Sequence, residues 1–178
     1  MRAAGRLSAV LAAGTVLSGF GSALADGLLG ASPAKPAAPP AATAAPAAPP
    51  APGSPTALIK PFYERFGLEL DPAQRGNFTA PAKKVLDDDE ALRKSGQGEC
   101  LDPNMALDNA AADAGQIAAS LKTLEAVDGD RAKVVVAFVE DGKPHRLEWK
   151  LERQGGAWKI ADLLSVTGEW ALSQYQCE

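Results

Sequence analysis

The sequence predicts one α+β domain, in which N-terminal helices pack on a curved four-stranded antiparallel sheet. Residues 57–178 hold most of the aromatic and β-branched side chains that a core requires, and their number suits a single domain. Apolar residues recur at helical spacing in the first part of this region. In its last part, apolar and polar residues alternate in four segments that short glycine-containing turns separate. These three observations predict the fold class.

Residues 1–25 have the parts of a secretory signal peptide. Two arginines lie near the start, and the stretch 7–20 is apolar and uncharged. Ala23 and Ala25 place small residues where signal peptidase requires them, so cleavage would leave Asp26 as the new N-terminus. An uncleaved membrane anchor is the alternative, but the stretch is short and rich in glycine and alanine for a span. We therefore expect a periplasmic or secreted protein without a stable membrane anchor.

Residues 26–56 are expected to form a disordered Ala/Pro-rich linker. Nine prolines and eleven alanines lie between positions 31 and 56. Proline lacks an N–H group and fixes φ, so this composition favours an extended polyproline II chain over helix or sheet. The linker is either a passive spacer or a tether that holds the domain away from a partner. The domain itself is expected to span residues 57–178.

Helices are predicted ahead of the sheet. The first runs over 59–67, with Pro61 in its first turn and one apolar face. The second runs over about 81–94, with Thr79 as the candidate N-cap. Asp102, which precedes a proline, is expected to cap a third, short helix.

Four strands follow, and the third gives the clearest signal. In that segment the leucines and Trp149 alternate with charged residues, which indicates one buried face and one face in water. The connecting turns are too short for a crossover helix, so the sheet must be an antiparallel meander covered on its apolar face by the helices. The C-terminal segment 168–178 is expected to pack back on the domain. The predicted strands are 117–127, 133–140, 145–153 and 158–165.

Four motifs carry a family resemblance: residues 59–63, residues 100–103, residues 132–138, and the hairpin 151–162 with its Trp-Lys-Ile-Ala-Asp ending. On these motifs the domain resembles the cystatin-like cone of the nuclear-transport-factor-two-like superfamily. More narrowly, it resembles the bacterial YbjP/YqhG-type envelope proteins of unknown function. The resemblance implies the cone fold. It implies no activity, because that superfamily contains enzymes, ligand binders and scaffolds.

Charge argues against some classes of partner. The chain carries 18 Lys and Arg against 22 Asp and Glu, and it has no basic stripe. An acidic chain does not attract phosphate backbones or anionic lipid surfaces, so neither nucleic acid nor a membrane surface is an expected partner.

Cys100 and Cys177 are the two cysteines of the chain. An even number in an exported protein favours a disulfide between them, which would tie the C-terminal tail to the Asp-Pro turn. Two free thiols, or a bond between two chains, are the alternatives. No Cys-x-x-Cys motif is present, so a redox catalyst is not expected.

No metal or other cofactor is expected. His145 is the single histidine, and with the two cysteines it cannot complete a closed zinc site. Asp102, Asn104 and Asp108 lack the loop glycine and terminal glutamate of a calcium-binding loop. The four consecutive carboxylates at 87–90 point in different directions on a helix, so we expect a solvated face there.

Five side chains are candidates for lining a ligand cleft, although each also has a structural interpretation. Tryptophans in such strands usually belong to the core, and the histidine fits a half-buried rim position. As a general base, the histidine would need one of the two aspartates nearby. No residue is assigned a catalytic role, because no nucleophile motif or phosphate-binding loop occurs. The candidates are His145, Trp149, Trp158, Asp108 and Asp162.

These features favour an exported, non-catalytic envelope protein that binds a small ligand or another protein. A deep pocket lined by Trp149 and His145 would favour a ligand, whereas a filled core with an exposed apolar patch would favour a protein partner. One alternative is a periplasmic immunity or inhibitor protein. The other is an isomerase-like or dehydratase-like enzyme that pairs His145 with Asp108 or Asp162.

Overall fold

The computed structural model describes residues 49–111 and 113–178 of the chain. The predicted signal peptide, its cleavage site and most of the linker lie outside these residues. No helix in the described part of the chain is long and apolar enough to cross a membrane.

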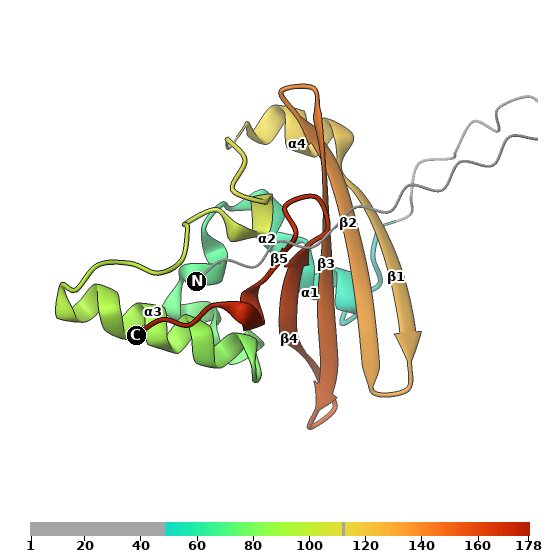
Figure 1. The fold of residues 1–178 in the computed structure, drawn as a ribbon. Helices are drawn as coiled ribbons and strands as arrows, with labels where there is room; N and C mark the ends of the chain where they lie inside the picture. Colours follow the sequence, from blue (N-terminus) through green and yellow to red (C-terminus); the bar gives the residue numbers. More distant parts are fainter. Residues whose placement is uncertain (1–48, 112) are drawn as a thin grey trace, which may run out of the picture. The chain divides into compact units, whose positions relative to one another are not determined.

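A five-stranded antiparallel sheet in the order β1-β2-β3-β4-β5 forms the centre of the structure (Figure 1). Two-residue turns join the first four strands, and each contains at least one residue with positive φ, as tight hairpins require. The predicted antiparallel sheet is confirmed, with five strands in place of the four expected. The strands are β1 Lys122–Asp128, β2 Arg131–Glu140, β3 Lys143–Gln154, β4 Ala157–Ser165 and β5 Trp170–Ala171.

The predicted strand 117–127 is wrong over its first half, where helix α4, Ala114–Ser120, stands. The carboxylate of Asp113 accepts hydrogen bonds from the backbone N–H groups of Gly115 and Gln116, and these bonds start the helix. Ile117 is the buried residue of α4. The extended chain begins only at β1.

Two short helices replace the single helix predicted over 59–67. They are α1, Pro55–Ile59, and α2, Pro61–Glu64, each with a proline in its first turn. Proline lacks an N–H group, so it fits a helix start and interrupts a helix that is already running. Helix α1 starts two residues ahead of the predicted domain boundary, capped by the hydroxyl of Ser54. Two 3₁₀ turns follow, η1 Leu68–Leu70 and η2 Pro72–Asn77.

Helix α3, Ala82–Ser95, matches the second predicted helix, but two predicted caps are wrong. Thr79 donates its backbone N–H to the Ile160 carbonyl, so it runs beside β4 and leaves the cap position to Pro81. Asp102 accepts a hydrogen bond from the Asn104 N–H in a local turn. The 3₁₀ turn beyond it, η3 Met105–Leu107, has Asn104 as its N-cap residue.

The core lies between the helices and one face of the sheet. Trp149 of β3 is fully buried and packs against Phe62 and Tyr63 of α2, with ring centroids 5.0 Å and 6.3 Å away. Its indole N–H donates to the Tyr63 hydroxyl at 2.9 Å, so the polar atom of this large side chain is satisfied inside the core. In Figure 1, α2 and α3 lie on one side of the sheet, and β1 forms the edge farthest from α3.

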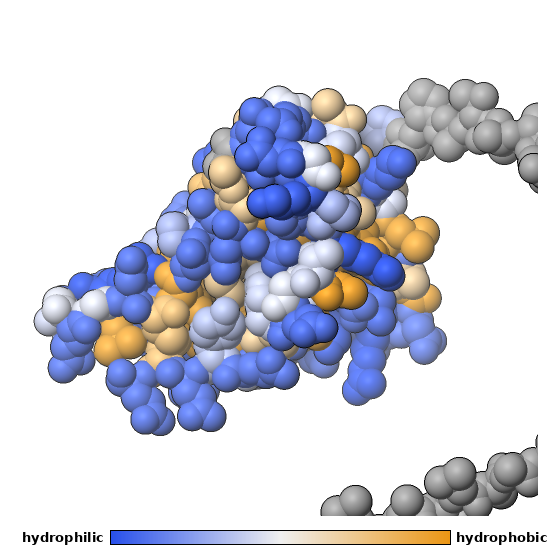
Figure 2. Space-filling model, turned by 45° about the horizontal axis from the view of Figure 1, so that its top comes forward, coloured by the Kyte–Doolittle hydropathy of each residue, from blue (hydrophilic) through white to orange (hydrophobic). Residues whose placement is uncertain are grey.

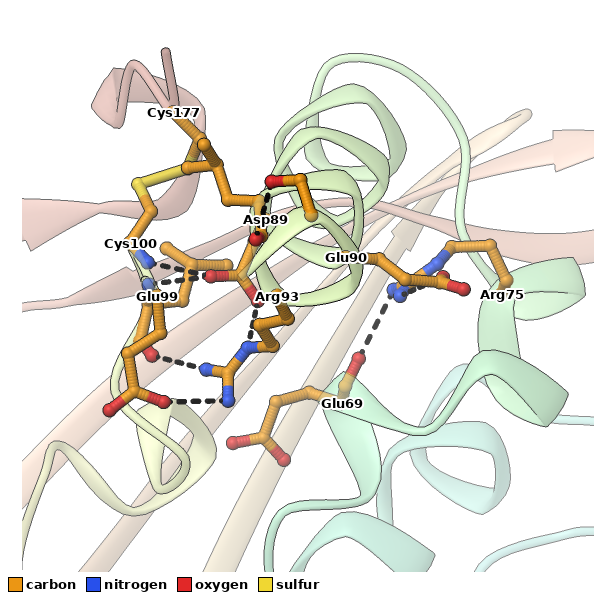
Figure 3. Close-up of polar contacts among 11 residues, drawn as sticks. Glu69, Arg75, Asp89, Glu90, Arg93, Glu99, Cys100 and Cys177 are labelled. Carbon is orange, nitrogen blue, oxygen red and sulfur yellow. Dashed lines mark hydrogen bonds and ion pairs between the residues drawn. A yellow bond between two sulfur atoms is a disulfide. The ribbon is translucent and has the colours of Figure 1, made fainter. Parts of the chain in front are cut away.

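A disulfide joins Cys100 to Cys177, with the Cα atoms 5.5 Å apart, which confirms the predicted internal pairing. Asp89 of α3 holds the loop that carries Cys100. Its carboxylate accepts the N–H groups of Cys100 and Leu101 at 2.8 and 2.9 Å and pairs with Arg93 at 2.7 Å (Figure 3). Asp89 is therefore buried, and the expectation of a solvated face over 87–90 is wrong at this position.

The hydrogen bonds also set the ionisation of Asp89. Burial alone would raise the pKa of this carboxyl, but the N–H groups of Leu101 and Cys100 and the Arg93 guanidinium together lower it below its ordinary value. Asp89 is thus held as a carboxylate that fixes one end of the disulfide loop.

Replacement of both cysteines by serine is expected to lower the free energy of unfolding. The bond closes a loop with a sequence separation of 77, worth about 4–5 kcal/mol in the chain-entropy model. We expect a loss of about 2–4 kcal/mol, measured by urea unfolding at neutral pH. Dithiothreitol should destabilise the wild type by a similar amount and leave the C100S/C177S variant unchanged. Equal stability of the two proteins would contradict a structural role for the bond.

Candidate functional site

The sheet face turned away from the core is open over β1, β2 and β3, and we call it the open face. Side chains alternate along each strand, so burial of Val134 and Trp149 on one face places Lys133 and Lys150 on the other. Every residue of β1 is exposed. Leu124, on the open face of this strand, is 70% exposed, and Val127, on its opposite face, is 51% exposed. Figure 2 shows hydrophobic residues at the surface on the side where Figure 1 places β1.

A hollow of about 770 Å³ crosses the open face from β1 to β4. Pro81, just ahead of α3, lies at its far end. Two rows of side chains that are direct cross-strand neighbours line the hollow, which places it on the open face and not in the core. The first row is Ala126, Lys133, Lys150 and Asp162, and the second includes Asp128, Arg131 and Glu152.

A β-bulge bends the floor of the hollow. The pairing of β3 with β4 shifts between Lys150 and Leu151, so that Ala161 is an extra residue on β4. A bulge of this kind increases the local twist and curves the strand. Two small residues that line the hollow, Ala126 and Ala161, leave space above the bent strands.

The hollow combines both signs of charge. Lys133 pairs with Glu148 at 2.9 Å. In the described part of the chain, Arg131 and Lys150 have no carboxylate at ion-pair distance, although acidic residues face them across the strands. Asp162 is engaged by the C-terminal tail, since its carboxylate accepts from the Ser173 N–H at 3.0 Å and from the Ser173 hydroxyl at 2.8 Å. Because they form no ion pair in the described part of the chain, the exposed cations Arg131 and Lys150 are available to contact an external partner.

A second polar cluster lies around Asp108, which follows η3 in the left-handed conformation with φ 58°. Its Oδ2 lies 3.0 Å from His145 Nδ1 and accepts the Thr167 hydroxyl at 2.8 Å, and its Oδ1 accepts the Trp170 indole N–H at 3.0 Å. A Cβ on Gly168 would stand 2.7 Å from this carboxylate, so glycine is required there. The cluster ties η3 to the start of β3 and to the β4–β5 turn.

The His145–Asp108 contact meets the geometric requirement for a base and the group that orients it. His145 also stacks on Phe138, with ring centroids 5.0 Å apart. Its second nitrogen, Nε2, is buried and has no hydrogen-bond partner in the described part of the chain, and His145 does not line the hollow. A catalytic base must reach its substrate, so this arrangement favours a structural clamp over catalysis.

The environment of Asp108 keeps it ionised. Burial alone would raise the pKa of this carboxyl, but side-chain hydrogen bonds from Ser165, Thr167, His145 and Trp170 lower it below its ordinary value. A carboxylate that accepts several hydrogen bonds contributes stability only while it is charged.

The five predicted cleft residues do not share one cleft. Asp108 and His145 come together in the clamp, and Asp162 lines the hollow. Trp149 is in the core, and Trp158 is buried beneath the Arg153 guanidinium, 4.5 Å from its ring centroid. Sequence analysis identified only the charged residues of β3 as a wet strand face, and it did not single out the cationic residues of β2. Their meeting in one hollow depends on the strand register.

Glu69 is a buried acid that sequence analysis missed. Its Oε1 accepts the Ala106 N–H at 3.0 Å, while its Oε2 is buried without a partner in the described part. Burial raises the pKa of this carboxyl above its ordinary value. A charged residue between two leucines in a 3₁₀ turn gives no periodic signal that would reveal its burial. Among residues 49–111 and 113–178, no three potential metal ligands come together.

Comparison with known proteins identifies no family. No protein-family model matches the sequence, and no curated protein does. Two solved structures resemble the fold. One is the type VI native effector–immunity complex Tae3–Tai3 from Ralstonia pickettii, with 20% identity and a TM-score of 0.44 over 64% of this chain and 96% of that chain. The other is a phospholipid-binding protein from Ralstonia solanacearum, with 14% identity and a TM-score of 0.30 over 68% of each chain.

Likeness at these scores assigns no function, because one fold can serve many activities. The resemblance to the cystatin-like cone and to the YbjP/YqhG-type proteins stays a prediction.

The Asp108→Asn variant is expected to unfold more easily at neutral pH, by about 1–3 kcal/mol, because the amide presents a donor to the donors around it. The folded pKa of Asp108 lies below the unfolded value of about 3.9, so its stabilisation is present above that pH and is lost as pH falls through the folded pKa. The difference between wild type and variant should therefore shrink in acid. Urea unfolding at several pH values measures it, with exposed Asp130→Asn as the control. A difference independent of pH would contradict a structural role for the ionised Asp108 carboxylate.

Proposed function

We propose that this chain is an exported, non-catalytic protein whose domain binds another protein through the open face of its sheet. The observation that carries the proposal is the hollow of about 770 Å³, which is lined by exposed charges and lies beside the fully exposed strand β1. Exposed apolar side chains next to exposed charges are typical of surfaces that contact other proteins.

The filled core favours a protein partner over a small ligand. Trp149, which would line an internal ligand pocket, is fully buried and packs against Phe62 and Tyr63. Small-molecule sites enclose most of the ligand in an apolar cavity. The hollow instead extends across four strands of the sheet, which suits the surface of a folded partner.

The disulfide supports an extracytoplasmic location. Bonds of this kind persist in oxidising compartments, and the Cys100–Cys177 bond fits the predicted signal peptide. An inhibitor or immunity protein would be one case of such a binding module, and the nature of the captured partner would specify it. The buried Nε2 of His145, which has no hydrogen-bond partner within the described residues, argues against the isomerase-like or dehydratase-like alternative.

Site-specific photo-crosslinking in cells of the source organism tests the proposal. A benzoylphenylalanine residue at Ala126 or Lys150, inside the hollow, should yield one defined adduct with a protein other than this chain. The same residue at Lys143, which is exposed in the sheet outside the hollow, should not yield that adduct.

Charge reversal then tests the chemistry of the contact. Lys150→Glu should reduce the adduct formed at Ala126, because it replaces a cation that has no ion-pair partner among residues 49–111 and 113–178. The matched reversal Lys143→Glu should leave the adduct unchanged. Absence of any adduct at the hollow positions, or equal adducts at position 143, would contradict binding through the open face.

A further inference from the structure

Among the residues that the structure describes, strand β1 pairs with another strand on one side only. It is first in the sheet order, and its seven residues pair with β2 from Lys122 to Asp128. A strand edge with unpaired N–H and C=O groups is a template for another strand, and proteins often guard such edges with charges, prolines or covering segments. No proline occurs in β1, and every residue of the strand is exposed.

Hairpin geometry shows which backbone groups face the free edge. Asp128 and Arg131 flank the two-residue turn of the β1–β2 hairpin, and such a flanking pair is hydrogen-bonded. Hydrogen-bonded pairs then recur at every second residue of β1. The remaining residues, Thr123, Glu125 and Val127, therefore direct their backbone N–H and C=O groups to the free edge. No backbone hydrogen bond outside the sheet uses them in the described part of the chain.

The one charge on β1 that points toward the core side does not guard this edge. The carboxylate of Glu125 is turned to α1, where its Oε2 accepts the Thr56 N–H at 2.8 Å and the Thr56 hydroxyl at 2.6 Å. An inward-pointing charge would oppose strand addition if it were unsatisfied. Here two donors from the same chain hold it.

The side chains of β1 complement a second, antiparallel copy of the same strand. With Glu125 on a two-fold axis, Lys122 of each strand faces Asp128 of the other, and Leu124 faces Ala126. The two Glu125 side chains also face each other, a like-charge pair that opposes pairing, and Thr56 of each chain holds its own Glu125 carboxylate toward α1. Opposite charges and apolar side chains that face each other across strands both favour pairing. These pairs fall at the positions not hydrogen-bonded across the free edge, where facing side chains come closest. The edge-facing backbone N–H and C=O groups of Thr123, Glu125 and Val127 in each strand can then form hydrogen bonds to the other strand.

We propose that β1 pairs antiparallel with β1 of a second copy of this chain, with Glu125 on the two-fold axis, so that the two sheets join edge to edge. Pairing of this kind is isologous, because the same strand serves both copies. Leu124, the most exposed large apolar side chain in the described part of the chain, then lies against Ala126 of the other copy. This inference goes beyond the proposed partner binding and does not rest on it.

The dimer is expected to be concentration-dependent. Each copy contributes seven strand residues to the contact, against about 20–30 residues a side in a standard interface. The hollow begins at β1, so pairing would place one hollow on each side of the axis. A partner that presents two copies of its own surface would then gain from binding both hollows together.

Sedimentation velocity of the exported chain, residues 26–178 with the disulfide intact, tests the dimer. The weight-average mass should rise from monomer toward dimer over about two decades of concentration. Leu124→Lys should move the midpoint to higher concentration by about tenfold, because it replaces an apolar contact of the paired strands. The matched variant Val166→Lys changes an apolar side chain that is 49% exposed and lies in the turn after β4, and it should leave the midpoint unchanged.

A charge swap tests the register. Lys122→Asp and Asp128→Lys each place like charges opposite one another in the dimer, so each alone should weaken it by about tenfold. The double variant K122D/D128K restores opposite charges and should recover the wild-type midpoint. Both positions are exposed, and circular dichroism checks that each variant is folded. A wild type that stays monomeric throughout, or a double variant as weak as the single ones, would overturn the proposal.

Discussion

The packing of α2 on Trp149 decides which face of the sheet is buried. Side chains alternate strictly along a strand, so a shift of one residue would exchange the two faces. Trp149 is fixed against Phe62 and Tyr63. Lys150, the next residue of β3, and Lys133, opposite it in β2, must therefore lie on the open face. The charged rows of the hollow thus follow from the position of the core. The bulge at Ala161 then bends the strands that carry them.

Buried carboxylates fix three of the irregular segments that surround the core. Asp89 holds the loop of Cys100, Asp162 holds the tail at Ser173, and Asp108 holds the β4–β5 turn. Each accepts several hydrogen bonds from segments that have little regular structure of their own. A buried polar group costs stability unless it is hydrogen-bonded, so each such contact specifies one arrangement of its segment. This role accounts for Asp108 and for the orientation of His145 without any catalytic step.

Local patterns predicted the strands better than the site. Segments 133–140, 145–153 and 158–165 lie within β2, β3 and β4, because alternation and glycine turns are written in consecutive residues. Helix α4 was missed because its Ala-rich sequence gives little periodicity and its start depends on the Asp113 cap. The hollow depends on register and on the bulge at Ala161, and the burial of Asp89 depends on a loop that folds back over α3. These tertiary contacts cannot be inferred from the pattern of consecutive residues.

Strand β1 is an ordered strand although none of its side chains is buried. Fixing the backbone costs about 1–2 kcal/mol per residue, and β1 buries no side chain to offset this cost. Its order therefore depends on the backbone ladder to β2 and on the two hydrogen bonds from Thr56 to Glu125. Thr56 belongs to α1, the first helix after the proline-rich segment. The Glu125 carboxylate thus links the exposed edge to the N-terminal end of the domain. A contact that stabilises β1 would therefore also stabilise the point at which the linker enters the domain.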